Sequence, residues 1–115
     1  MKLFTFSKEI GKEIKAFGSN FVMSRIGTGE EGFHVGCMYL DKNDVIGRHD
    51  AVTSQLFLVV SGEGWVSGAD HEKVRINVGE AAFWEKGESH EAGSETTMIA
   101  IVIEAESLNP AMMLL

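Results

Sequence analysis

The sequence predicts an all-β fold, an antiparallel sandwich or barrel formed by one domain over residues 1–115. Thirteen glycines and only one proline separate short runs that are rich in β-branched and aromatic residues. No long stretch has the apolar spacing of an amphipathic helix. A chain of 115 residues can bury a real core but is too short for two domains.

The N-terminal segment is the least regular part of the pattern. Lys2–Phe6 alternates weakly and is predicted to form an edge strand. The apolar residues of Ser7–Phe17 have helical spacing, but Gly11 interrupts them, so a short helical turn or an irregular segment is expected there.

Further strands are predicted wherever β-favouring residues run between turn-forming ones. They are Asn20–Ile26, Phe33–Leu40, Leu56–Val60, Gly64–Val66, Val74–Val78, Ala81–Trp84 and Thr96–Glu104. The turns predicted between them include Asp41–Asp44, the tight glycine turn Ser61–Gly64, and Gly68–His71.

Composition and charge exclude several classes of partner. Ten basic and seventeen acidic side chains give a formal charge of −7, which repels nucleic acid and anionic membranes. No apolar window is long enough for a membrane helix, and the N-terminus does not resemble a signal peptide. The single cysteine, Cys37, lies among apolar residues and is expected to be buried. A cytoplasmic location is therefore expected.

Ile46–Trp65 contains the first candidate site residues. Alternation along an extended chain places His49 and Gln55 on the same face as Phe57. One face would therefore present an imidazole nitrogen and an amide oxygen above an apolar floor.

Gly79–Ser94 contains the second group. An apolar strand ends at Trp84, and a turn then leads to His90. His90 could meet His49 and Gln55 only if the two strand pairs face each other across a barrel.

These two stretches resemble the paired motifs of the cupin superfamily, which are small jelly-roll barrels, or double-stranded β-helices, of the RmlC-like type. In the first motif the spacing of a His-x-His pair, a glutamate and a glycine is matched by His49, Ala51, Gln55 and Gly62. In the second, the spacing of glycine, proline, glycine, histidine and asparagine is matched by Gly79, Glu85, Gly87, His90 and Ser94. The motif-bearing core covers about residues 47–94. The resemblance implies a single cupin barrel with little or no helix.

The departures from the family pattern concern the metal. Metal-binding cupins hold one divalent ion with the two first-motif histidines, the glutamate and the second-motif histidine. Here Ala51 and Gln55 stand at two of those four positions. The remaining set of His49, Gln55 and His90 is neutral and incomplete, although imidazole suits zinc, iron, nickel or copper. If a divalent metal is bound, zinc, iron, nickel or manganese is expected.

Two functions remain open. The first, which the lost ligands favour, is a barrel that binds a small polar ligand in its interior through His49, Gln55 and His90, with Trp65 and Trp84 lining the site. The alternative is a metal-dependent enzyme, an isomerase or oxygenase acting on a sugar or small organic acid, with the same three residues as metal ligands. Large aromatic residues in strands also commonly serve only the core.

The C-terminal segment Pro110–Leu115 is unusually apolar. Either it packs back onto the barrel or it covers a partner subunit, because an exposed apolar end favours aggregation. Since cupins commonly dimerise, the resemblance implies a homodimer.

Overall fold

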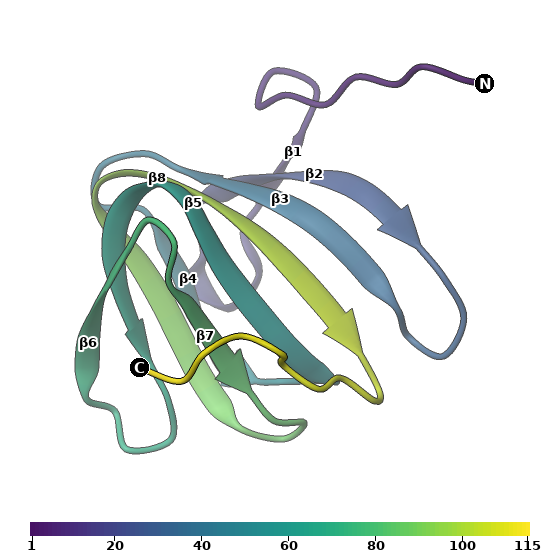
Figure 1. Cartoon of the computed structure of the whole chain (residues 1–115). Helices are drawn as coiled ribbons and strands as arrows, with labels where there is room; N and C mark the ends of the chain where they lie inside the picture. The colour runs from purple at the N-terminus through teal and green to yellow at the C-terminus, as the bar shows by residue number, and fades with distance from the viewer.

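The computed structural model describes residues 1–115 and contains eight β-strands and one short 3₁₀ turn (Figure 1). In chain order the elements are β1 (Lys12–Ile14), η1 (Ala16–Gly18), β2 (Phe21–Thr28), β3 (His34–Leu40), β4 (Val45–Asp50), β5 (Ser54–Ser67), β6 (Lys73–Asn77), β7 (Ala81–Trp84) and β8 (Ser89–Ala105). The predicted all-β barrel is confirmed. No helix is long and apolar enough to cross a membrane.

Two long strands organise the barrel. All strand pairs are antiparallel, and the main path runs β1-β2-β3-β8-β5-β6, with β4 also paired to β8 and β7 to β5. β5 and β8 pair along almost their whole length, with register shifts at Val59/Ser61 and Gly62/Gly64. Such bulges increase local twist and bend a strand, so each long strand passes from one sheet layer to the other.

The region Ser61–Gly64 differs from its prediction. The chain does not reverse there, because β5 continues through all four residues. Gly62 has φ +74°, and a Cβ at this position would lie 1.7 Å from the carbonyl oxygen of Thr97. Glycine is therefore needed for the close approach of two bent strands, not for a hairpin turn.

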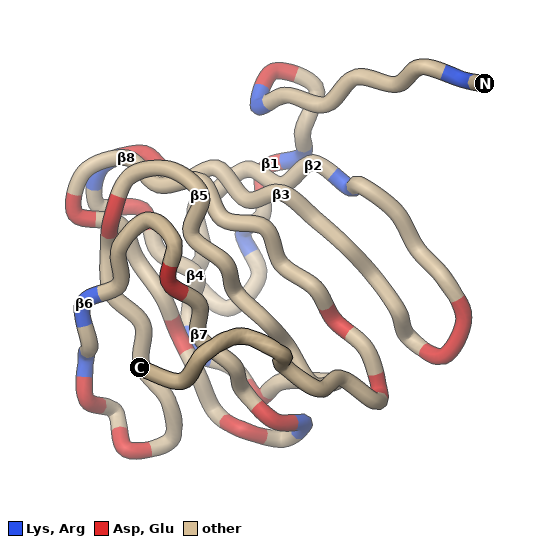
Figure 2. The backbone as a smooth tube through the Cα atoms, in the orientation of Figure 1, with Lys and Arg blue, Asp and Glu red and all other residues tan.

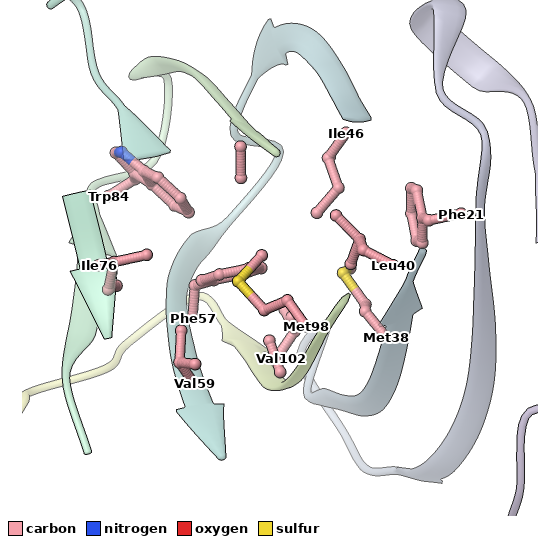
Figure 3. Packing of buried hydrophobic residues seen from close by; sticks show 12 residues of the cluster. Phe21, Met38, Leu40, Ile46, Phe57, Val59, Ile76, Trp84, Met98 and Val102 are labelled. Atoms are coloured by element: carbon pink, nitrogen blue, oxygen red, sulfur yellow. The ribbon is translucent and has the colours of Figure 1, made fainter. Parts of the chain in front are cut away.

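The core fills the space between the two layers, and side chains from both layers meet there. Phe57, Leu40, Met98 and Val102 are almost completely buried (Figure 3). The predicted burial of Cys37 is also confirmed.

Two details near the ends of the chain correct the sequence-based expectations. Lys2–Phe6 is not a strand: it has no neighbouring strand to bond with, its side chains are exposed, and it projects from the barrel (Figure 1). Part of Ser7–Phe17 instead forms β1, which pairs with β2, followed by η1. The tail does not bury its side chains against the barrel, since Met113, Leu114 and Leu115 are more than 90% exposed.

Candidate functional site: a stacked histidine pair

The two candidate histidines lie directly opposite each other on neighbouring strands. β4 is hydrogen-bonded to β8, and His49 is the register partner of His90. They therefore meet within one sheet layer and not across the barrel. A register shift between Ile46 and His49 allows both of these residues to face inward, while Arg48 faces outward.

Gly47, inside this bulge, brings η1 against β4. A Cβ on Gly47 would lie 1.7 Å from the carbonyl oxygen of Phe17, so only glycine permits this contact. The Gly47 N–H also donates to the hydroxyl of Ser19, at 2.9 Å. The result is that Phe17, which has φ +58°, places its ring flat on His49.

Four rings form a continuous stack from the surface into the core. Phe17 and His49 are parallel to within 5°, His49 and His90 are tilted, and His90 stacks on Trp84. Each of the three centroid distances is 4.5 Å. Trp84 then contacts Phe57 in the core, at 5.9 Å. Both imidazole rings are thus fixed in position by neighbours on their faces.

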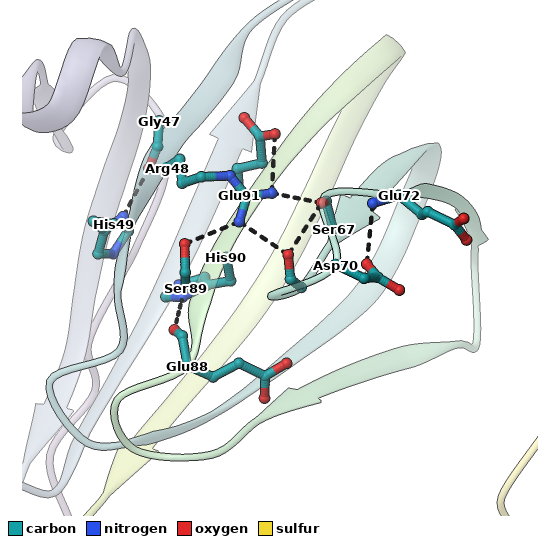
Figure 4. Close-up of polar contacts among 11 residues, drawn as sticks. Gly47, Arg48, His49, Ser67, Asp70, Glu72, Glu88, Ser89, His90 and Glu91 are labelled. Atoms are coloured by element: carbon teal, nitrogen blue, oxygen red, sulfur yellow. Dashed lines mark hydrogen bonds and ion pairs between the residues drawn. The ribbon is translucent and has the colours of Figure 1, made fainter.

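Backbone carbonyls set the tautomer of both histidines. His49 Nδ1 lies 2.7 Å from the carbonyl oxygen of Gly47, and His90 Nδ1 lies 3.1 Å from that of Glu88 (Figure 4). A carbonyl oxygen only accepts, so each Nδ1 carries the hydrogen and each neutral ring presents Nε2 as a lone pair.

His90 Nε2 is buried and has no hydrogen-bond partner. Burial lowers the pKa of His90 below its ordinary value of 6.5, and the nearby His49 and Arg48 lower it further, against the bond to the Glu88 carbonyl. The ring therefore stays neutral at pH 7 and offers an acceptor atom that the protein itself does not use. Buried polar atoms usually have a partner, so this one requires an explanation.

The other predicted site residues fall into two groups. Gln55 and Trp84 are register partners on β5 and β7, and both are buried, but no hydrogen bond joins Gln55 to either imidazole. Trp65 lies on the outer face, where its ring covers Gly93 and Lys73 Nζ sits 4.1 Å from the ring centroid. At the register shift between Val59 and Ser61, β5 advances two residues against one of β8, and this single extra residue inverts the alternation between Gln55 and Trp65. The interior placement expected for Trp65 is therefore not found.

The sequence analysis missed Arg48 and the polar cluster around it. The Arg48 guanidinium donates to Gly68 O, Ser89 Oγ, Ser67 Oγ and Glu91 Oε1, at 2.6–3.2 Å (Figure 4). Arg48 precedes His49, and Glu91 follows His90, so simple alternation already places both on the opposite face from the histidines. The cluster ties β4, β5 and β8 together directly behind the imidazoles.

The donor set does not fit a resident divalent metal. Two imidazole Nε2 atoms are free to ligate, but no group of three or more His, Cys, Asp or Glu side chains is arranged to hold an ion. Gln55 would add only a neutral amide oxygen, so no negative charge would balance the dication. We therefore assign no chemical step to a metal in this site.

The larger surface cavities border other parts of the barrel. Four of them measure about 430–630 Å³, and none of these four is lined by His49, Gln55 or His90. Phe17 covers the outer face of His49, and the core lies behind Trp84. Nε2 of His90 is itself buried, so a ligand reaches it only if a neighbouring side chain or segment moves.

Comparisons with known proteins show which fold this is. No protein-family model and no curated protein matches the chain. Several solved structures, however, match the chain. An RmlC-like cupin from Shewanella frigidimarina has a TM-score of 0.73 at 22% identity, with 93% of each chain covered. A cupin-like protein from Thermotoga maritima has a TM-score of 0.77 at 15% identity, covering 88% of this chain and 80% of that one.

A third similar structure belongs to a protein that is named after an enzymatic activity. It is a Thermotoga maritima protein described as a "predicted oxalate decarboxylase", with a TM-score of 0.70 at 18% identity, covering 87% of this chain and 96% of that one. At these identities the likeness shows the fold alone. The chain has the cupin fold, as its two motifs predicted.

Proposed function

We propose that this cupin-fold protein binds a small polar ligand through the Nε2 atoms of His49 and His90. The observation that supports this most directly is the buried, unpartnered Nε2 of His90. An acceptor left unpaired in the interior costs about 1–3 kcal/mol, which a ligand hydrogen bond would offset. The ligand must therefore carry a donor, such as a hydroxyl or an N–H group.

Phe17 is the residue that must move for the ligand to enter. Its ring covers His49 but is itself 66% exposed, and it belongs to a single turn with a left-handed backbone conformation. The exposed ring can rotate away from His49 while the backbone of η1 keeps its contact with Gly47, so opening is local and leaves the sheet intact. Once inside, the ligand would contact the imidazole edges, and Gln55 could add an amide from the neighbouring strand.

Imidazole NMR tests this proposal. Histidine-labelled protein is titrated with a panel of glucose, galactose, lactate, malate and glycerol, and the ring ¹⁵N signals of His49 and His90 are followed. We expect at least one compound to shift both Nε2 signals saturably, and we expect His90→Phe to abolish that shift. Signals that no compound moves, or binding that survives His90→Phe, would contradict the proposal.

The metal-dependent enzyme remains the alternative hypothesis. It would gain support from stoichiometric zinc, iron, nickel or manganese in protein purified without a tag or chelator, provided that His49→Phe and His90→Phe both remove the metal. Protein without stoichiometric metal supports the binding function instead.

We also propose that the protein forms a homodimer through its C-terminal tail. Met113, Leu114 and Leu115 are almost fully exposed, and the tail borders an apolar cavity of about 630 Å³ with Leu56 and Phe83. Exposed apolar surface of this kind commonly marks an interface. Light scattering should give twice the 12.6 kDa of one chain, and a triple serine variant of residues 113–115 should be monomeric. A wild-type monomer at high concentration would contradict this.

A further inference from the structure

A second cavity lies at the end of the barrel where two loops meet. It measures about 440 Å³ and is bordered by the loop between β5 and β6 and by the turn between β7 and β8. Three acidic residues, Asp70, Glu72 and Glu88, line it, and we call it the acidic cavity. Figure 2 shows acidic residues in both connections at this end of the barrel. Its volume is in the range of small-molecule sites.

Arg48 lies behind the wall of the acidic cavity, where it donates to Gly68 O and Ser67 Oγ, but no basic side chain is paired with its carboxylates. No basic side chain lines the cavity, and its three carboxylates take part in no ion pair. One oxygen of Asp70 accepts from the Glu72 N–H, and one oxygen of Glu88 accepts from the Glu85 N–H. The second oxygen of Glu88 has no hydrogen bond. It lies 2.8 Å from the place that a Cβ on Gly68 would take, so glycine leaves room for it.

Trp84 supplies an unused donor at the same place. It is only 4% exposed, one face of its ring is stacked on His90, and it lines the acidic cavity. Its indole nitrogen is 3.8 Å from the Cβ position of Gly68, and Figure 3 shows this nitrogen on the side of the ring away from Phe57. No protein acceptor takes the indole N–H. Because this edge of the ring borders the cavity, the N–H is free to donate to an acceptor atom from outside the chain.

We propose that the acidic cavity binds a small organic amine that also carries an oxygen acceptor. The ammonium group pairs with Glu88, with Asp70 and Glu72 adding negative potential, and the oxygen accepts from the Trp84 N–H. The apolar part of the amine lies against Val74 and Phe83, which belong to the apolar part of the lining. The site does not depend on ligand binding by the histidine pair, because it uses only the edge of the Trp84 ring.

The experiment follows the Trp84 indole N–H resonance while 4-methoxybenzylamine is added. The chain has two tryptophans, so Trp65→Phe leaves a single indole signal. The neutral 4-methoxybenzyl alcohol and the anionic 4-methoxybenzoate have the same shape and serve as ligand controls. We expect a saturable shift with the amine, and at least about tenfold weaker binding of the other two compounds.

Matched carboxylate variants locate the charge. Glu88→Gln should weaken amine binding about tenfold, whereas Glu95→Gln, an exposed carboxylate in no ion pair, should change it less than about twofold. Asp70→Asn provides a second test in case Glu88→Gln perturbs the fold. An indole signal that does not move up to about 10 mM amine would overturn the proposal. So would equal binding of amine and alcohol, or equal weakening by the Glu88 and Glu95 variants.

Discussion

The two faces of the β4–β8 strand pair differ in whether their polar side chains have hydrogen-bond partners. On the outer face, Arg48 donates to four oxygens and Glu91 accepts from it, so the charged groups there are paired. On the inner face, one residue further along β4 and one residue earlier on β8, His49 and His90 share a ring stack. There, His90 Nε2 is buried without a partner (Figure 4).

This difference separates the structural role of the outer cluster from the binding role that we propose for the histidines. A satisfied polar network adds stability and fixes strand register, whereas a half-satisfied buried group lowers stability. The outer cluster therefore holds β4, β5 and β8 in register, and the inner pair carries a cost that folding alone does not explain. Binding sites commonly show this trade of stability for an available polar group.

Removing the Arg48 guanidinium should have the largest effect on this comparison. Arg48→Met keeps the aliphatic stem but leaves Ser67, which is 2% exposed, and the Glu91 carboxylate without their donor. We expect the free energy of unfolding to fall by about 2 kcal/mol. Urea denaturation measures this, with an unchanged slope showing that the unfolded state is the same.

Arg75→Met is the matched control. Arg75 pairs with Glu63 across β5 and β6, but its side chain is 58% exposed. Such pairs contribute less than about 1 kcal/mol because water and salt screen them. Equal losses in the two variants would show that the outer cluster contributes no more than an ordinary surface ion pair.

The strand pattern was predictable because it depends on local sequence. β7 was predicted with its observed bounds, and β2, β3 and β6 were predicted to within about two residues of each end. β4 was missed as a strand because Gly47 and the following bulge break the alternation that marks a half-buried strand. Its stability comes from pairing with β8, a contact that no local pattern records.

The candidate site was predicted in composition but not in arrangement. His49 and His90 were identified from motif spacing, yet their direct pairing depends on strand order, which the spacing does not give. Phe17 was missed because it lies in a segment without regular pattern, and a backbone contact at Gly47 brings it to His49. Trp65 was placed inside because the extra residue of β5 between Val59 and Ser61 inverts the alternation and leaves no sequence signal that simple counting detects.

A smaller effect of the opposite sign is expected on the inner face. His90→Phe keeps a ring to stack on Trp84 and removes the unpartnered Nε2. Because the buried acceptor is eliminated, we expect the free energy of unfolding at pH 7.5 to rise by about 1 kcal/mol. Urea denaturation of His90→Phe and of Arg48→Met tests both faces. If His90→Phe instead loses more than about 2 kcal/mol of unfolding free energy, His90 serves as a core residue.

The same variant should also change how stability depends on pH. The pKa of His90 is lowered in the folded protein, so between pH 6.5 and the folded pKa the unfolded chain binds a proton that the folded chain does not. The contribution of His90 to stability is therefore complete above pH 6.5 and is lost as the pH falls through this window. His90→Phe removes that loss, and we expect its unfolding free energy to fall less steeply between pH 7 and 5, by at most about 1.4 kcal/mol per pH unit. Parallel pH profiles would mean that His90 takes up its proton as readily in the folded barrel as in the unfolded chain, and that its ring is less isolated from water than the stack between His49 and Trp84 implies.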